Sequence, residues 1–178
     1  MSPIEKETML ASMVVLVDTR EQPTAQARRR YNSFGLPYRR ATLDFGDYTY
    51  NAQRPDGTWI HNEDIRITPL VSVERKMSLD ELASCFTHGR KRFAAEFDRA
   101  KEAGARIVLL VEGATWENLI NGRYRSRFRP KAFLASIVAW MIRYGAGILF
   151  CKEDTSGQLI KEVLYRDLKE RIENGEYG

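Results

Sequence analysis

Three consecutive charged residues, Glu74, Arg75 and Lys76, have the clearest potential for chemistry, and they follow a short apolar stretch. Successive side chains of a strand point to opposite faces, so Glu74 and Lys76 would share one face and Arg75 would lie on the other. A carboxylate and an ammonium side by side near the end of a strand can hold a cation and polarise a phosphate. We therefore expect Val71 to Lys76 to be a strand that carries part of a functional site.

A helix is expected directly after this strand. Ser78 followed three residues later by Glu81 is a capping box, which predicts a helix from Ser78 to Phe86. The segment from Lys91 to Ala103 has apolar residues at helical spacing and predicts a second helix.

A first group of further acids follows the apolar run from Met13 to Val17. Such a run is typical of a strand buried on both faces of a sheet. It ends in Asp18, Arg20 and Glu21, and α/β proteins place ligands at the carboxyl ends of their strands. Taken alone, these charges are better explained as a solvated strand exit.

Another acid, Asp47, follows Gly46 in a turn that leads into the strand-like segment Tyr48 to Tyr50. The tight turn marked by Pro55-Asp56-Gly57 comes next and predicts a hairpin. This hairpin would bring Asp47 beside the strand that holds Glu74.

Together these acids form a set of donors suited to a hard divalent cation. Four carboxylates around one lysine would repel one another unless a cation lay among them, and oxygen ligands without a His/Cys cluster favour Mg²⁺ or Mn²⁺ over zinc. A magnesium ion held by two carboxylates keeps positions open for water and for a phosphate oxygen. Lys76 would then stabilise charge on the transition state, or orient or deprotonate the water. The carboxylates are Asp18, Glu21, Asp47 and Glu74.

A basic segment without any acid runs from Asn121 to Lys131. Its cations would repel one another unless something anionic lay nearby, so it is the best candidate for a DNA-facing loop, with a flexible solvated loop as the alternative. The net charge of +4 fits a nucleic-acid partner only weakly. The cations are Arg123, Arg125, Arg127, Arg129 and Lys131.

Three blocks of the sequence occur in order: Val17 to Glu21, Gly46 to Tyr48, and Val73 to Lys76 with Asp80 four residues on. Together they resemble the nuclease domain of the XPF family (excision-repair cross-complementing group four), whose signature is Gly-Asp, a spacer, Glu-Arg-Lys and a later Asp. The resemblance covers about residues 14–160. It implies a restriction-endonuclease-like core. The order of the expected strands and helices along the chain itself predicts an α/β fold with a central mixed β-sheet and helices on both faces.

This resemblance implies a DNA endonuclease that depends on Mg²⁺ or Mn²⁺ and prefers branched or flapped DNA in repair, recombination or replication. Two alternatives stay open: an inactive DNA-binding partner subunit, and a nuclease that cuts ordinary duplex without preference. The expected location is the cytoplasm for a bacterial or phage protein and the nucleus for a eukaryotic one.

The family pattern also implies roles for the residues of the signature. Asp47 and Glu74 would be metal ligands together with the backbone carbonyl of Arg75, and Lys76 would be the catalytic lysine. Arg75 would otherwise support the site through packing.

Further residues would complete the site by the same resemblance. Asp18 and Glu21 would be additional acidic members, as ligands through water or for a second ion. Arg20 and Arg90 would hold phosphates or the acidic residues. Asp80 would favour the helix N-terminus or orient Arg75 or Lys76.

The expected organisation is a flexible segment over residues 1–12, a single nuclease domain over 13–173 and a tail over 174–178. The helix-hairpin-helix module that many relatives carry is not expected here. The length of 178 residues and the hydrophobic content of 43% are ordinary for one soluble domain. Cys85 and Cys151 are expected to be free thiols, and His61 and His88 to be surface residues.

Two further helices carry specific expectations. The uncharged segment from Ala132 to Ile142 predicts a helix buried on every side, either central to the core or partly covered by a second subunit in a homodimer. The segment from Thr24 to Phe34 predicts a helix whose three consecutive arginines, Arg28 to Arg30, form a solvated face, with phosphate contact as the alternative.

Overall fold

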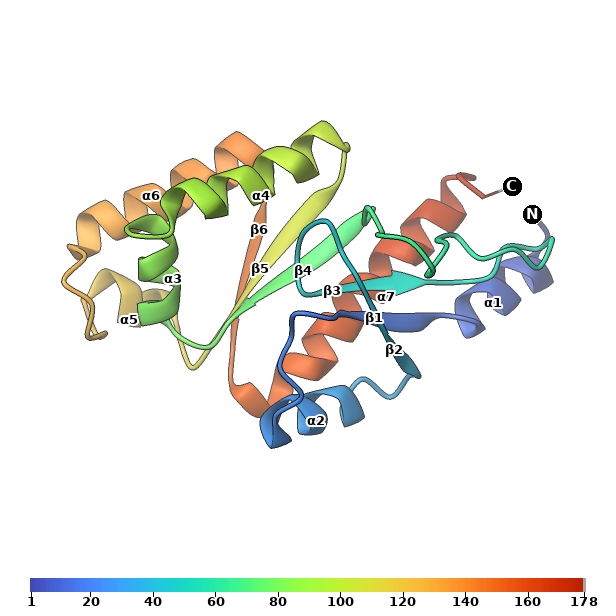
Figure 1. Ribbon diagram of the computed structural model, residues 1–178, viewed down its shortest axis with the longest axis horizontal. Coiled ribbons are helices and arrows are strands. Elements are labelled where there is room, and N and C mark those ends of the chain that lie inside the picture. Colours follow the sequence, from blue (N-terminus) through green and yellow to red (C-terminus); the bar gives the residue numbers. More distant parts are fainter. Residues whose placement is uncertain (178) are drawn as a thin grey trace.

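The computed structural model describes residues 1–177, which form one six-stranded mixed sheet with helices on both faces (Figure 1). The strand order is β2-β1-β3-β4-β5-β6. Strand β3 runs antiparallel to both of its neighbours, and the other adjacent pairs are parallel. The strands are β1 (Val14–Asp18), β2 (Tyr38–Ala41), β3 (Tyr48–Asn51), β4 (Val71–Lys76), β5 (Arg106–Glu112) and β6 (Gly147–Cys151). The expected α/β fold with a central mixed sheet is confirmed.

The helices divide between the two faces of the sheet (Figure 1). Helices α3 to α6 pack on one face through a cluster rich in aromatic residues, and α1, α2 and α7 cover the other. The helices are α1 (Pro3–Ala11), α2 (Ala25–Asn32), α3 (Leu79–Phe86), α4 (Arg90–Glu102), α5 (Trp116–Ile120), α6 (Pro130–Tyr144) and α7 (Ser156–Glu173), with a short 3-10 turn at Glu153–Thr155. Among residues 1–177, no helix is long and apolar enough to cross a membrane.

The predicted pairing of the segment after Asp47 with the strand of Glu74 is confirmed. Strands β3 and β4 are antiparallel, and the N–H of Asp47 donates to the carbonyl of Val73 at 2.9 Å. The predicted turn at Pro55-Asp56-Gly57 is formed, since the N–H of Arg54 donates to the carbonyl of Thr58 at 2.7 Å and the N–H of Gly57 to that of Arg54 at 2.9 Å. This turn is local, because β3 ends at Asn51 and β4 begins only at Val71. The chain nevertheless returns in the register that the site needs.

The N-terminal residues differ from the sequence expectation of a flexible segment, because they form helix α1. Ser2 caps this helix in a reciprocal capping box with Glu5, and Met9 is buried against the core. Lys6 also forms an ion pair with Glu173 of α7 at 3.0 Å. The capping signal was present in the sequence, and docking against α7 supplies the burial that a short polar helix needs.

Helix α6 corrects a second expectation, since it is not buried on every side. Only Phe133, Ile137 and Trp140 are buried along it, whereas Val138 and Ile142 are 41% and 79% exposed. The helix is the outer layer of its side of the sheet, so one stripe contacts the core and the opposite stripe faces outward.

Arg30 corrects the third expectation, because it does not belong to a solvated face. It is 4% exposed and donates from Nε to Glu112 at 3.1 Å and from Nη1 to the Tyr48 hydroxyl at 3.3 Å. Glu112 also accepts a hydrogen bond from Arg75 at 3.1 Å. Helix α2 therefore turns this one arginine inward, where a single buried carboxylate serves two guanidinium groups.

Glu112→Gln should destabilise the protein because it leaves two largely buried arginines short of negative charge. We expect the free energy of unfolding in urea to fall by about 3 kcal/mol. The exposed substitution Arg28→Ala, on the same helix as Arg30, should change it by less than about 0.5 kcal/mol. Equal effects of the two substitutions would contradict the importance of the buried pair.

Candidate metal centre

Three carboxylates lie in a row across the carboxyl-terminal end of β1, the turn before β3 and the end of β4. The N–H of Asp18 donates to the carbonyl of Asp47 at 2.8 Å, and the β3–β4 register places Asp47 opposite Glu74. Residues directly opposite each other in antiparallel strands point to the same face of the sheet. Asp18, Asp47 and Glu74 therefore share the face that α3 and α4 cover.

Glu74 and Lys76 lie together on this face, as the alternation of the strand predicts. They are 5% and 8% exposed, and Lys76 Nζ donates to Glu74 Oε1. The ammonium also lies 5.6 Å from the ring centroid of Phe93. Burial raises the pKa of Glu74 to about 7 although Lys76 opposes this shift. Burial lowers the pKa of Lys76, but the Glu74 carboxylate outweighs it and raises that pKa above its ordinary value.

Asp47 is fixed by backbone groups of β4, which contact both its main-chain N–H and its carboxylate. Its Oδ2 accepts the N–H of Arg75 at 2.7 Å. Burial raises the pKa of Asp47 well above its ordinary value, and repulsion from Glu74 and Glu21 adds to the shift. Holding this carboxylate charged is therefore unfavourable in the protein alone, and a nearby cation would relieve that cost.

Both carboxylate oxygens of Asp18 accept hydrogen bonds from other residues of the protein. Its Oδ1 accepts from the Arg20 backbone N–H and from Arg20 Nε, both at 2.7 Å, and its Oδ2 accepts from the Leu43 N–H at 2.9 Å. Asp18 therefore ties the end of β1 to the segment after β2. Arg20 keeps a side chain that is 60% exposed beside the row of acids.

The remaining predicted acid, Glu21, contacts residues of the opposite face. It accepts from the Tyr48 hydroxyl at 3.0 Å and pairs with Arg75 at 3.7 Å. The Arg75 side chain reaches from there to Glu112, so it points away from Lys76 as the strand alternation predicts. The structure thus joins Glu21 to the buried arginine network, while Asp18, Asp47 and Glu74 line the other face.

A small cavity of about 200 Å³ opens beside Glu74 and Lys76. Helices α3 and α4 form its wall and contribute Glu96, which sequence analysis missed. Glu96 follows Phe93 by three residues, at the edge of the apolar stripe of α4, and only the packing of that helix shows that it faces the site. The lining also includes Glu81, Ser84, Cys85, Gly89 and Arg92.

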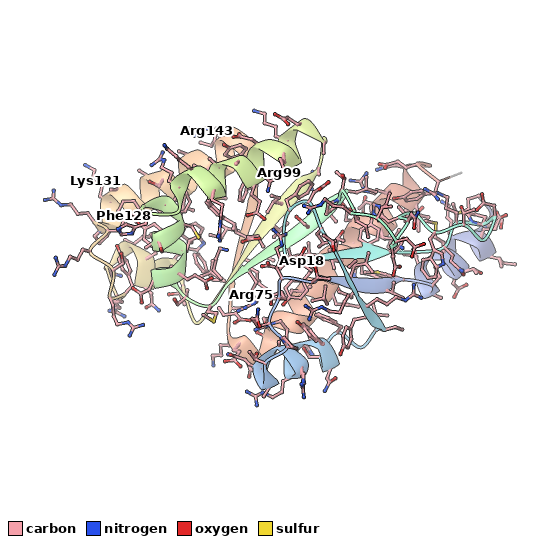
Figure 2. All side chains as sticks on the ribbon, in the orientation of Figure 1. Asp18, Arg75, Arg99, Phe128, Lys131 and Arg143 are labelled. Atoms are coloured by element: carbon pink, nitrogen blue, oxygen red, sulfur yellow. The ribbon has the colours of Figure 1, made fainter. Side chains whose placement is uncertain are left out.

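The basic segment is held to the start of α3 by Asp80. Asp80 Oδ1 accepts the backbone N–H groups of Arg125 and Ser126 at 2.8 and 2.6 Å. The hydrogen bonds of Asp80 in the described part of the chain thus go to this loop, and neither Arg75 nor Lys76 takes part in them. Figure 2 shows Phe128 and Lys131 toward the N-terminal end of α6, and Asp18 and Arg75 nearer the middle of the molecule.

The cations of this loop project from an anchored segment. The Tyr124 hydroxyl donates to the carbonyl of Phe128 at 2.7 Å, and the rings of both residues pack on Phe133. Arg125 is largely exposed. Arg90, the remaining predicted cation, is exposed at the first turn of α4.

The donors on the site face suit a metal that needs few protein ligands. Among residues 1–177, no group of three or more His, Cys, Asp or Glu side chains is arranged to hold a metal ion. Mg²⁺ commonly takes only one or two carboxylates and completes its shell with water and substrate oxygens. The half-buried Asp47 and the buried Glu74, both with raised carboxyl pKa values, fit such an ion.

Comparison with known proteins agrees with this arrangement. The family model of the ERCC4 domain matches residues 17–163. The chain belongs to this family. The family includes structure-specific DNA endonucleases, and its nucleases typically use divalent metals. No curated protein sequence matches the chain.

Solved structures show the same fold. XPF from Aeropyrum pernix superposes with a TM-score of 0.59 at 23% identity, over 88% of this chain and 68% of that one. XPF from Aeropyrum pernix in complex with DNA gives a TM-score of 0.59 at 24% identity, over 88% of this chain and 65% of that one. The chain thus spans about two thirds of the length of these relatives, and the likeness confirms the expected nuclease-domain fold.

Gly46→Ala should be much more damaging than the same change at Gly57. Both glycines have positive φ (73° and 84°), but a Cβ at Gly46 would overlap the buried side chain of Ser72, whereas Gly57 has open space. We expect losses in unfolding free energy of about 3 kcal/mol at Gly46 and about 1 kcal/mol at Gly57, measured in urea. Similar losses at the two positions would show that the turn before Asp47 is not closely packed.

Proposed function

We propose that residues 13–173 form a nuclease domain that hydrolyses phosphodiester bonds in DNA with a divalent metal, preferring branched or flapped substrates. One observation carries the proposal: Asp47 and Glu74 lie on one face of the sheet beside Lys76, at the signature positions of a family that includes structure-specific endonucleases. A DNA substrate would place the protein in the bacterial cytoplasm or the eukaryotic nucleus.

Asp47 and Glu74 would hold the metal, Mg²⁺ or Mn²⁺, together with the backbone carbonyl of Arg75. When bound, such an ion stabilises charge on the phosphate and lowers the pKa of a water molecule. The chain supplies the rest. The N–H of Arg75 fixes Asp47, and Lys76, held by Glu74, places positive charge where the phosphate develops its negative charge.

The residues that would contact DNA lie at three places around this centre. Arg20 is exposed beside the row of acids, and Arg90 is exposed on α4. The loop that Asp80 anchors adds Arg123, Arg125, Arg127, Arg129 and Lys131. Anchored cations lose less conformational freedom on binding than mobile ones, which favours this loop as a phosphate-binding surface.

The role of Asp18 and Glu21 in this proposal is to position other groups. Asp18 holds Arg20 against the acidic row, and Glu21 helps to neutralise Arg75. By the family pattern, Asp18 and Glu21 would also contact a metal through water or hold a second ion.

Purified protein should cut labelled flap, fork or junction DNA in Mg²⁺ or Mn²⁺ and not in chelator. Asp47→Asn and Lys76→Ala should each lower the rate by about 100-fold or more, because a ligand and the transition-state cation are removed. The exposed Asp64→Asn is the matched control and should cut like the unaltered protein.

Other outcomes of this assay identify the alternatives. Cleavage that survives chelator or both site substitutions would contradict the mechanism. Tight binding of branched DNA without cleavage in either metal would identify an inactive partner subunit. Equal rates on linear and branched duplex would identify a nuclease without structural preference.

We also propose that the protein forms a homodimer through the outward stripe of α6, which exposes Val138 and Ile142. Sedimentation should give the mass of a dimer, and Ile142→Glu should shift the population to monomer, because a charge would replace an apolar contact. The control is Ile4→Glu on α1, which is similarly exposed and should leave the mass unchanged. A monomer at high protein concentration would contradict this proposal.

A further inference from the structure

A carboxylate from helix α4 holds the turn that carries Asp47. Glu96 Oε1 accepts the backbone N–H of Gly46 at 2.8 Å, and Gly46 directly precedes Asp47. Glu96 is half-buried and lines the same cavity as Glu74 and Lys76.

Other contacts show that α4 fixes this turn at several points. Phe45 is fully buried in the aromatic cluster to which α4 contributes Phe93 and Phe97. Arg99, one helical turn after Glu96, donates to the carbonyl of Asp44 at 3.2 Å, and Figure 2 shows Arg99 on α4. The helix therefore contacts the turn before, at and after Phe45.

The strands fix the other side of the turn. Asp47 donates its N–H to Val73 and accepts the N–H of Arg75 on its carboxylate. These hydrogen bonds fix which residues of β4 lie opposite Asp47. The bond from Gly46 to Glu96 sets the path of the chain as it enters Asp47, at a glycine with φ of 73° and little room to move beside Ser72.

We propose that Glu96 is a positioning residue for Asp47, acting through the Gly46 N–H to hold the metal-binding carboxylate in place. This inference rests on the proposed metal centre. Glu96 acts through the oxygen that accepts this hydrogen bond, so an amide oxygen at the same place should serve nearly as well as a carboxylate.

The mechanism predicts how metal affinity depends on residue 96. Groups that orient metal ligands typically change metal affinity by about 10- to 100-fold when they are removed. Glu96→Ala removes the acceptor and leaves the turn free to shift. Glu96→Gln keeps an acceptor oxygen of the same reach and removes only the charge.

Two measurements on the full chain test this role. Mn²⁺ titration by calorimetry should show affinity about 10-fold weaker for Glu96→Ala and within about threefold of the unaltered protein for Glu96→Gln. Glu102→Ala, an exposed change on the same helix, should bind like the unaltered protein. Amide hydrogen exchange of Gly46 without metal should be fast in Glu96→Ala and slow in Glu96→Gln.

The outcomes separate this inference from the metal centre itself. If Glu96→Ala binds Mn²⁺ as tightly as the unaltered protein, the positioning role is wrong. If Glu96→Gln binds as weakly as Glu96→Ala, Glu96 acts through its charge and the inference is also wrong. If the unaltered protein binds no Mn²⁺, the metal centre fails, and the exchange rates of Gly46 alone then support or overturn the role of Glu96.

Discussion

The antiparallel register of β3 between β1 and β4 is the constraint on which the site depends. It sets Asp18, Asp47 and Glu74 side by side on one face, although they are far apart in sequence. Because side chains alternate along a strand, a slip of one residue in either pairing would send a carboxylate to the other face. The turn at Gly46 and its contacts with α4 and Ser72 protect that register.

The same alternation divides the charges of the signature between two environments. On one face, Glu74 and Lys76 lie with Asp47, where carboxylates outnumber the lysine and a divalent cation is the natural complement. On the other face, Arg75 joins a network in which the carboxylates of Glu21 and Glu112 already meet buried guanidinium groups. On the Arg75 face, the protein's own side chains balance the charges. On the Asp47 and Glu74 face, negative charge remains in excess, and a bound cation can balance it.

Local patterns predicted much of this molecule. The burial of β1, the capped start of α3 at Ser78 and the opposite directions of Glu74 and Arg75 all follow from periodicity and capping, which need only neighbouring residues. The proximity of Asp47 to Glu74 followed from turn signals and was confirmed by the pairing of β3 with β4.

The features that sequence analysis missed depend on contacts between distant segments. In the sequence, Arg30 cannot be distinguished from the two arginines before it. Only the packing of α2 turns it toward Glu112, which is 82 residues away. In the sequence, Glu96 looks like one of the solvent-facing polar residues of α4. Its hydrogen bond to Gly46 exists only because the helix packs over that turn. Asp80 reads as a helix-start acid, yet its carboxylate holds a loop 45 residues further along the chain. The uncharged sequence of α6 shows that the helix is apolar. Which of its sides is buried depends on the elements that pack around it, and the sequence of the helix alone does not give these.

The central claim is that Asp47 and Glu74 form the metal centre, and anomalous diffraction from crystals soaked in Mn²⁺ tests it most directly. The account predicts one strong peak about 2.0–2.3 Å from a carboxylate oxygen of each residue, with water completing the shell. A peak bound by Asp18 or Glu21 and remote from Asp47 and Glu74 would contradict it, as would fully soaked crystals with no peak on this face of the sheet.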